Sequence, residues 1–215
     1  MRSRFEIVRL LMEAKLIAVI RTNRGEQVQP VCEALVAGGI TALEITLTTP
    51  NAIEAIREAR ATFGHGAVIG AGTVLTAAST HEVIAAGAEF VVSPITRTEI
   101  VEAAHSRERP VMIGAYTPTE MQTAHEAGAD FIKLFPADKL GAAYVKSVRG
   151  PLPDLRIVPT GGVDLNTMAD FLNAGCAALG VGSSLITSEI LRTENWTDLR
   201  TLAGEFVRVA REAKK

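Results

Sequence analysis

The sequence predicts an α/β fold, a single (β/α)8 barrel domain that follows an N-terminal helix. Two observations predict it: eight short apolar runs alternate with stretches of helical periodicity, and Ala-Gly recurs where a helical stretch ends. Strands that are apolar almost throughout are typical of a parallel sheet covered by helices. Eight of them in 215 residues favour a closed barrel over the alternative, an open doubly wound sheet, which would usually need fewer strands.

The predicted elements follow one another along residues 1–215. We expect residues 1–15 to form an amphipathic helix and not a signal peptide, because charged residues interrupt its apolar positions. The strands fall within residues 16–186, at 16–21, 42–47, 67–74, 90–94, 110–116, 131–136, 156–162 and 178–185. Helical periodicity fills 25–39, 51–63, 77–87, 96–106, 117–128, 141–148 and 165–175 between them, and residues 187–215 form a C-terminal helical segment.

A weak internal repeat supports these boundaries. The segments AGGITALEI, AGAEFVVS, AGADFIKLF and AGCAALGVG each place Ala-Gly between a helical stretch and a strand. Glycine adopts the left-handed conformation of a helix C-cap without steric cost. The repeat therefore predicts that four helices end just before four strands.

Composition excludes several classes of protein. The chain is 47% hydrophobic and 21% charged with a net charge of −2, so we expect a soluble domain that binds no nucleic acid. No apolar run is long enough to span a bilayer. The two cysteines lie far apart and read as reduced core residues of a cytoplasmic protein, and the four histidines lack metal-ligand spacing. The sequence thus predicts no metal site.

Polar residues embedded in the strands are the candidates for chemistry. Glu44 and Thr46 lie two residues apart in ALEITL, so they share the inner face while their apolar neighbours face the helices. Lys133 points inward in FIKLFP by the same argument. Arg21 and Thr73 close two strands at the carboxyl ends, where barrel active sites lie.

The embedded lysine and glutamate have two interpretations. They can form a structural buried ion pair, whose desolvation cost can exceed its Coulomb gain. Alternatively, apolar surroundings disfavour the ammonium form, and a neutral amine beside a proton-transferring carboxylate is suited to forming a Schiff base with a carbonyl substrate. We favour the second interpretation, because titrating groups in unusual surroundings cluster at functional sites.

Glycines close the last two strands. Strand seven ends in Pro-Thr-Gly-Gly, with Gly161 and Gly162, and strand eight continues into Gly182 and Ser183. Glycine allows backbone N–H groups to approach an anion closely, and the loops after strands seven and eight are the usual phosphate site of this fold. Tight turns alone would also explain the glycines, but two clusters with adjacent hydroxyls favour a phosphate site.

The motifs LEITLTTP, GAGTV, VVSP, FIKLFP, VPTGGV and GVGSSL occur in this order. Together they resemble the class I pyruvate aldolases that cleave 2-keto-3-deoxy-6-phosphogluconate and 4-hydroxy-2-oxoglutarate. The resemblance runs from about residue 16 to residue 186. It implies a lyase that releases pyruvate with glyceraldehyde 3-phosphate or glyoxylate, acts on a phosphorylated 2-oxo acid, needs no metal or other cofactor and forms a homotrimer.

The resemblance also implies roles for single residues. Lys133 corresponds to the Schiff-base lysine and Glu44 to the general acid and base, while Arg21 and Thr73 correspond to the groups that hold the substrate carboxylate. The remaining correspondences are the walls of the pocket near the imine (Pro94, Phe135 and Thr160) and the phosphate cradle (Gly161, Gly162, Gly182 and Ser183).

Two departures from the family pattern bear on the substrate. Some members carry an arginine at the position of Thr48, so carboxylate binding would rest more heavily on Arg21 here. The family often has Pro-Gly where this chain has Ile113-Gly114. Two alternatives therefore stay open: an aldolase for the phosphogalactonate epimer, and a barrel that binds phosphorylated metabolites without catalysis.

Overall fold

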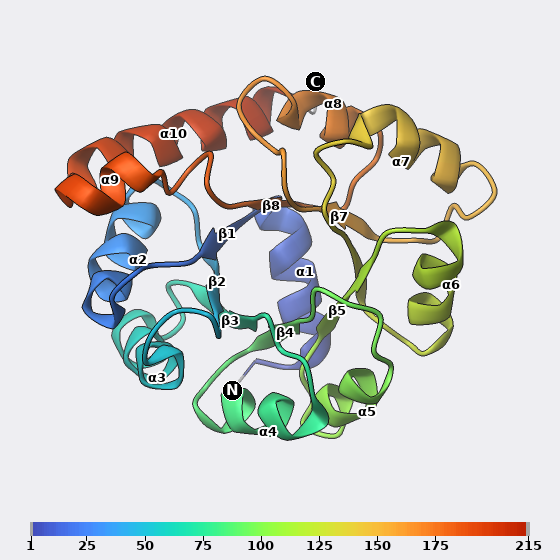
Figure 1. Ribbon diagram of the computed structural model, residues 1–215, viewed down its shortest axis with the longest axis horizontal. Helices are drawn as coiled ribbons and strands as arrows, with labels where there is room; N and C mark the ends of the chain where they lie inside the picture. The colour runs from blue at the N-terminus through green and yellow to red at the C-terminus, as the bar shows by residue number, and fades with distance from the viewer. Residues whose placement is uncertain (1, 214–215) are drawn as a thin grey trace.

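The computed structural model describes residues 2–213, in which eight parallel strands form a ring surrounded by helices (Figure 1). The strands are β1 (Leu16–Ile20), β2 (Ala42–Thr46), β3 (Val68–Gly72), β4 (Phe90–Val92), β5 (Val111–Ala115), β6 (Phe131–Leu134), β7 (Ile157–Pro159) and β8 (Leu179–Val181). The helices are α1 (Arg4–Ala14), the 3-10 turn η1 (Gly25–Gln27), α2 (Val28–Ala37), α3 (Ala52–Phe63), α4 (Ala77–Ala85), α5 (Glu99–His105), α6 (Pro118–Glu126), α7 (Gly141–Arg149), α8 (Met168–Asn173), α9 (Ser188–Thr193) and α10 (Trp196–Glu212).

The strand order closes the sheet into a barrel. Each strand from β1 to β7 pairs in parallel with the next one, and β8 pairs with β1. The remaining gap, between β7 and β8, is spanned by a parallel bridge from Thr160 to Gly180. The predicted (β/α)8 barrel with an N-terminal helix is confirmed, and the open doubly wound alternative is excluded.

The last two strands are shorter than predicted. β7 covers Ile157–Pro159 instead of 156–162, and β8 covers Leu179–Val181 instead of 178–185. Gly161 and Gly162 have φ angles of 86° and 73°, which no extended strand adopts. The predicted strand seven was too long because it included these two glycines, whose backbone conformation turns the chain away from the sheet.

The Ala-Gly repeat marks helix ends as predicted. Gly87, Gly128 and Gly175 have φ angles of 110°, 94° and 88° and follow α4, α6 and α8. In the first copy the left-handed residue is the second glycine of the pair, Gly39, with φ of 96°, while Gly38 remains in the right-handed region.

Each strand buries both faces. The residues on either side of Lys133 and Glu44, such as Ile132 and Leu43, belong to the large apolar cluster shared with the helices. A second cluster fills the barrel interior toward its amino-terminal end. Its strand residues are Ile17, Ala42, Val68, Phe90, Val92, Met112, Phe131 and Val158.

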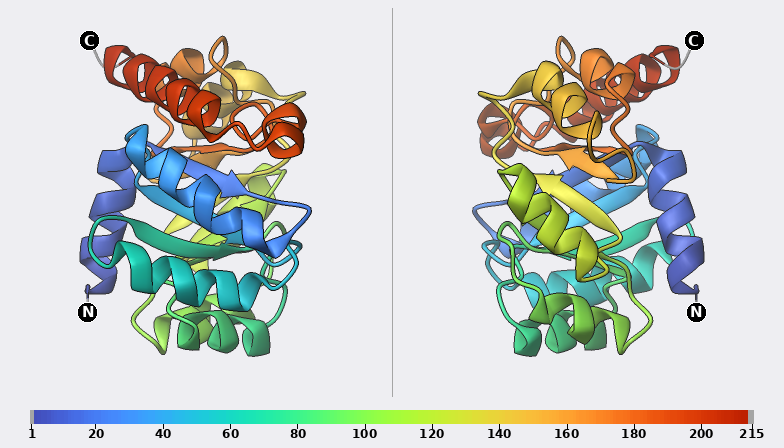
Figure 2. Two further views of the ribbon diagram at one scale, coloured as in Figure 1. Left: turned by 90° about the vertical axis from the view of Figure 1, so that its left-hand side faces the viewer. Right: turned by 90° about the vertical axis from the view of Figure 1, so that its right-hand side faces the viewer.

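The N-terminal helix closes one end of the barrel. Ile7, Val8 and Leu11 of α1 are buried against the interior cluster, and Figure 2 shows α1 lying across the end of the barrel opposite α9. Ion pairs fasten the start of the helix: Arg2 Nη1 lies 3.1 Å from Glu89 Oε2, and Arg4 Nη2 lies 2.8 Å from Asp130 Oδ1. The interior is thus reached from the carboxyl ends of the strands.

Candidate active site

Lys133 and Glu44 meet inside the barrel. They lie on β6 and β2, four strands apart in a ring of eight and therefore on opposite walls. Lys133 Nζ is 3.4 Å from Glu44 Oε1, and the two residues are 5% and 2% exposed. Lys133 Nζ also lies 5.4 Å from the centre of the Phe135 ring, within cation–π range. The inward orientation predicted from the strand pattern is observed, and a lysine long enough to cross the barrel is what brings the pair together.

Glycines border this pair where other strands would carry side chains. Gly70 is in register with Glu44, and Gly114 is in register with Lys133. A Cβ added at Gly72 would lie 2.0 Å from Glu44 Oε1, and one at Gly114 would lie 2.1 Å from the carbonyl carbon of Pro94. Both are closer than real Cβ contacts, so the carboxylate occupies space that a side chain at position 72 would fill.

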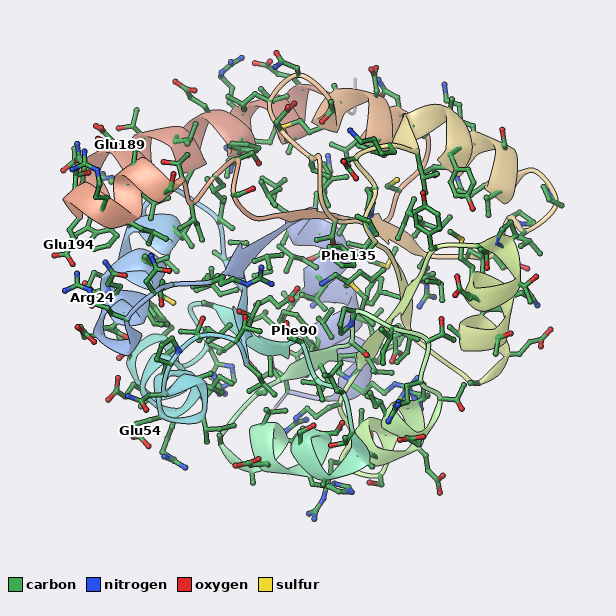
Figure 3. All side chains as sticks on the ribbon, in the orientation of Figure 1. Arg24, Glu54, Phe90, Phe135, Glu189 and Glu194 are labelled. Carbon is green, nitrogen blue, oxygen red and sulfur yellow. The ribbon has the colours of Figure 1, made fainter. Side chains whose placement is uncertain are left out.

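A cavity of about 430 Å³ opens at the carboxyl ends of β1, β6, β7 and β8. Seven of the predicted site residues line it: Arg21, Phe135, Thr160, Gly161, Gly162, Gly182 and Ser183. Figure 3 shows Phe135 inside the ring of strands, whereas Glu54 lies at the outer edge of the molecule. The cavity therefore adjoins the buried pair through Phe135, which follows Lys133 by two residues and lies just past the end of β6.

The structure does not bring Thr73 and Pro94 to this cavity. They follow β3 and β4 and are half-buried. Thr73 has a φ of 59°, a left-handed conformation that is uncommon for a threonine. Backbone strain of this kind is found at functional sites, so Thr73 stays a candidate on the β3 side of the barrel mouth.

Two glycines in the left-handed region shape one end of the cavity. Gly161 and Gly162 both have positive φ, and a Cβ at Gly162 would lie 2.5 Å from Asp138 Cα. Thr160 donates its N–H to Leu134 O at 2.9 Å, and Thr160 O accepts from Ala137 N at 3.0 Å. These bonds join the loop after β6 to the start of the loop after β7, so the two loops form one side of the cavity.

Further residues, which the sequence pattern did not single out, line the same cavity. They are Val19, Asn23, Val163, Asp164, Ser184, Ile186, Ser188 and Leu191. Asn23 has the strand parity of Arg21, and Ser188 lies at the start of the predicted C-terminal helical segment, so both carried a detectable signal. The Asp164 carboxylate accepts hydrogen bonds from Asn166 N and Thr167 N, at 2.8 and 2.9 Å, which was not visible in the sequence.

A cluster of polar side chains, here called the polar clamp, connects Gln27 and Arg24 to the end of α9 at the edge of the cavity. Gln27 is 3% exposed and donates its amide to Leu191 O at 2.9 Å and to Glu194 Oε1 at 3.2 Å. Arg24 pairs with the same Glu194 carboxylate, and Figure 3 shows these two side chains near each other at the edge of the molecule. The clamp joins the loop after β1, which carries Arg21 and Asn23, to α9, which carries Ser188.

Within residues 2–213, no three His, Cys, Asp or Glu side chains gather as metal ligands. None of the helices in this range combines the length and apolar character needed to cross a membrane.

Known proteins with similar sequences belong to one family of aldolases. Residues 7–202 match the family model described as "Aldolase: KDPG and KHG aldolase". The 2-dehydro-3-deoxy-phosphogluconate aldolase of Pseudomonas aeruginosa is 37% identical over 91% of this chain and 89% of its own length. A Rhizobium meliloti protein named "Probable 2-dehydro-3-deoxy-6-phosphogalactonate aldolase" is 38% identical over 81% of this chain and 82% of its own.

A solved structure agrees with these sequence relatives. The KDPG aldolase of Legionella pneumophila, with pyruvate captured as a covalent carbinolamine, superposes with a TM-score of 0.85 at 34% identity. The superposition covers 92% of this chain and 96% of that one. The match of the family model over most of the chain and relatives above 30% identity lead to one conclusion: this chain belongs to the KDPG and KHG aldolase family and is an aldolase, a lyase.

Proposed function

We propose that the protein is a class I aldolase that cleaves 2-keto-3-deoxy-6-phosphogluconate to pyruvate and glyceraldehyde 3-phosphate through a Schiff base on Lys133. The observation that carries the proposal is the buried contact of 3.4 Å between Lys133 Nζ and Glu44 Oε1, next to a cavity that ends in glycine loops. A structural ion pair alone would not require that cavity.

The first step is attack on the ketone. The neutral amine of Lys133 adds to C2 of the 2-oxo acid, and the carbinolamine loses water to give a cationic imine. Arg21, which follows β1, and Thr73, which follows β3, flank the end of β2, and together they hold the C1 carboxylate and fix the orientation of C2.

The second step breaks the C3–C4 bond. The C4 hydroxyl gives its proton to Glu44, directly or through water, while the bonding electrons pass into the imine to form an enamine. The aldehyde leaves. The enamine then takes a proton at C3 and is hydrolysed by water, which frees Lys133 and releases pyruvate.

The glycine loops serve the remote phosphate. N–H groups at Gly161, Gly162 and Gly182, together with the Ser183 hydroxyl, provide donors where the cavity ends. Phe135 and Thr160 form the wall between the phosphate end of the cavity and the imine. Pro94 borders β5, the strand that pairs with the Lys133 strand β6. Binding energy from the phosphate orients the reacting carbons, so its loss lowers turnover as well as affinity.

Trapping tests the proposal. Borohydride in the presence of pyruvate should reduce the imine and add a stable mass to the peptide that contains Lys133. Glu44→Gln should still be trapped but turn over at least ~100-fold more slowly, within the range for general acid–base catalysis. An unmodified Lys133 would exclude the Schiff base on this residue. Full turnover in Glu44→Gln would exclude Glu44 as the general acid and base.

The phosphogalactonate epimer is a second candidate substrate. The Rhizobium meliloti relative supports it, and Thr48 is one of the two departures from the family pattern that bear on the substrate. A pyruvate-release assay across the gluconate and galactonate substrates and 4-hydroxy-2-oxoglutarate ranks the three. Binding without release of pyruvate from any of them would instead support a non-catalytic barrel.

The family resemblance also implies a domain organisation, an oligomeric state and a cellular location for the protein. We infer a single barrel domain over residues 1–215, a homotrimer and a cytoplasmic protein, as the family resemblance implies. Analytical ultracentrifugation measures the assembly, because a trimer has three times the 22.8 kDa mass of the chain. Cell fractionation measures the location.

A further inference from the structure

A chain of hydroxyl groups ties Arg21 to the end of the second strand. Arg21 Nε lies 3.0 Å from Thr48 Oγ1, and Thr48 Oγ1 lies 3.0 Å from Thr46 Oγ1. Thr46 Oγ1 in turn lies 3.1 Å from the carbonyl oxygen of Ile20. The chain begins at the side chain of Arg21 and returns to the backbone of the residue before it.

Counting protons fixes the direction of this chain. A guanidinium Nε–H only donates and a carbonyl oxygen only accepts. Each threonine hydroxyl has one proton, so Arg21 donates to Thr48, Thr48 donates to Thr46, and Thr46 donates to Ile20. The arrangement has one consistent orientation, and Thr46 is 1% exposed, so water does not readily replace its bonds.

The chain leaves the ends of the guanidinium available. Only Nε of Arg21 has a hydrogen-bond partner among residues 2–213, and no carboxylate in that range forms an ion pair with it. Arg21 lines the cavity, where the acidic neighbour Asp164 already accepts bonds from its own loop. The two terminal nitrogens can therefore bind one carboxylate in the parallel geometry that arginine favours.

The position suits the carboxylate next to the reacting ketone. Lys133 Nζ already lies against β2, through its contact with Glu44. Thr46 shares the inner face of β2 with Glu44 and lies two residues closer to the mouth. The neighbouring strand is β1, and Arg21 follows its last residue. A C1 carboxylate, one bond from the imine carbon, therefore falls on the side of the barrel where the hydroxyl chain holds Arg21.

We propose that Thr48 is a positioning residue for substrate: with Thr46 it orients Arg21 so that its two terminal nitrogens bind the carboxylate of the 2-oxo acid. This inference rests on the proposed function for its ligand, but carboxylate binding does not depend on turnover. Thr48 touches the arginine and not the reacting atoms, so its loss affects ligand binding more than bond cleavage.

The test compares two variants with two ligands. Thr48→Val removes the hydroxyl at nearly constant volume, and Thr48→Ser keeps it. Titration calorimetry of each protein measures the dissociation constants for pyruvate and for methyl pyruvate, whose ester has no negative charge. Thr48 is exposed, so thermal unfolding of both variants should match that of the wild type.

Thr48→Val should weaken pyruvate binding roughly tenfold, as expected for losing one hydrogen bond to a charged group. Its affinity for methyl pyruvate should stay within about twofold of the wild type, and Thr48→Ser should bind both ligands nearly as the wild type does. In turnover, KM should rise in Thr48→Val while kcat changes little.

The inference is overturned if pyruvate binding is unchanged in Thr48→Val, if both ligands weaken equally, or if Thr48→Ser loses as much as Thr48→Val. Failure of the wild type to bind pyruvate would overturn it too. Failure of borohydride trapping on Lys133 in a protein that binds pyruvate would instead refute the proposed aldolase mechanism and leave the calorimetric comparison valid.

Discussion

Adding one methyl group at Gly72 should displace the Glu44 carboxylate. An alanine Cβ at this position would lie 2.0 Å from Glu44 Oε1, 2.7 Å from its Cδ and 2.8 Å from its Cγ. Atoms in contact prefer separations of about 3.5 Å, so the carboxylate oxygen must move by roughly 1.5 Å. Misplacement of a reacting group by about 1 Å can lower a rate by around 100-fold, and we expect a loss of that order in kcat for Gly72→Ala.

Two assays separate displacement of Glu44 from damage to the whole site. Pyruvate release gives kcat, and borohydride trapping reports whether Lys133 still forms the imine. Trapping should persist in Gly72→Ala, because the added methyl group contacts the carboxylate and not the amine. Gly204→Ala is the matched control: Gly204 lies within α10, and the nearest atom to its added Cβ is 4.0 Å away. That variant should keep full activity and gain up to ~1 kcal/mol of stability from helix propensity.

The reasoning is refuted if Gly72→Ala keeps a kcat within about threefold of the wild type, far above the ~100-fold loss expected from misplacement. It is also refuted if Gly72→Ala loses trapping and turnover together while remaining folded, because that result would place the damage at Lys133. A crystal structure of the variant locates the carboxylate directly.

Two further predictions concern the phosphate end and the cysteines. Gly182→Ala should fold normally, since its Cβ would meet nothing closer than 3.8 Å, yet the added methyl should obstruct a phosphate, raising KM for phosphorylated substrates while leaving 4-hydroxy-2-oxoglutarate cleavage unchanged. Equal effects on both substrates would refute a phosphate cradle there. Burial raises the pKa of the Cys32 and Cys176 thiols from 9.0 to about 12, so neither should react with a thiol reagent at pH 8 until the protein unfolds. Because the unfolded chain loses these protons first, the thiols' contribution to stability is complete below pH 9 and falls as the pH rises toward 12. A Cys32→Ala/Cys176→Ala variant should show a shallower loss in that range, measured by denaturant unfolding, and an equally steep one would contradict the assignment.

The fold was predictable because its signals are local. Alternation of apolar runs with helical stretches gave the eight strands, and parity within a strand turned Lys133 and Glu44 inward. Both patterns are local and do not depend on which strands are neighbours. The boundaries failed where backbone conformation overrides the apolar pattern, as at Gly161 and Gly162, whose positive φ angles end β7 early.

The parts of the site that were missed depend on contacts across strands. The hydrogen bond from Arg21 to Thr48 joins residues 27 apart in sequence, so Thr48 appeared only as a departure from a family pattern. The space that Gly72 leaves for Glu44 depends on the register of β2 against β3, which no single stretch of sequence reveals. Asn23 and Ser188 were within reach of the sequence argument, because one follows Arg21 by two positions and the other begins a suggested helix.

Because α1 covers one end of the barrel, the interior is open only at the other end. Ile7, Val8 and Leu11 seal the amino-terminal end, so substrate enters and both products leave by the same mouth. In the proposed mechanism the pyruvate fragment stays bound to Lys133 at the inner end, and the aldehyde lies on the side of the mouth. That mechanism orders the departure of the products, with the aldehyde first and pyruvate last, and in the reverse condensation pyruvate has to bind before the aldehyde.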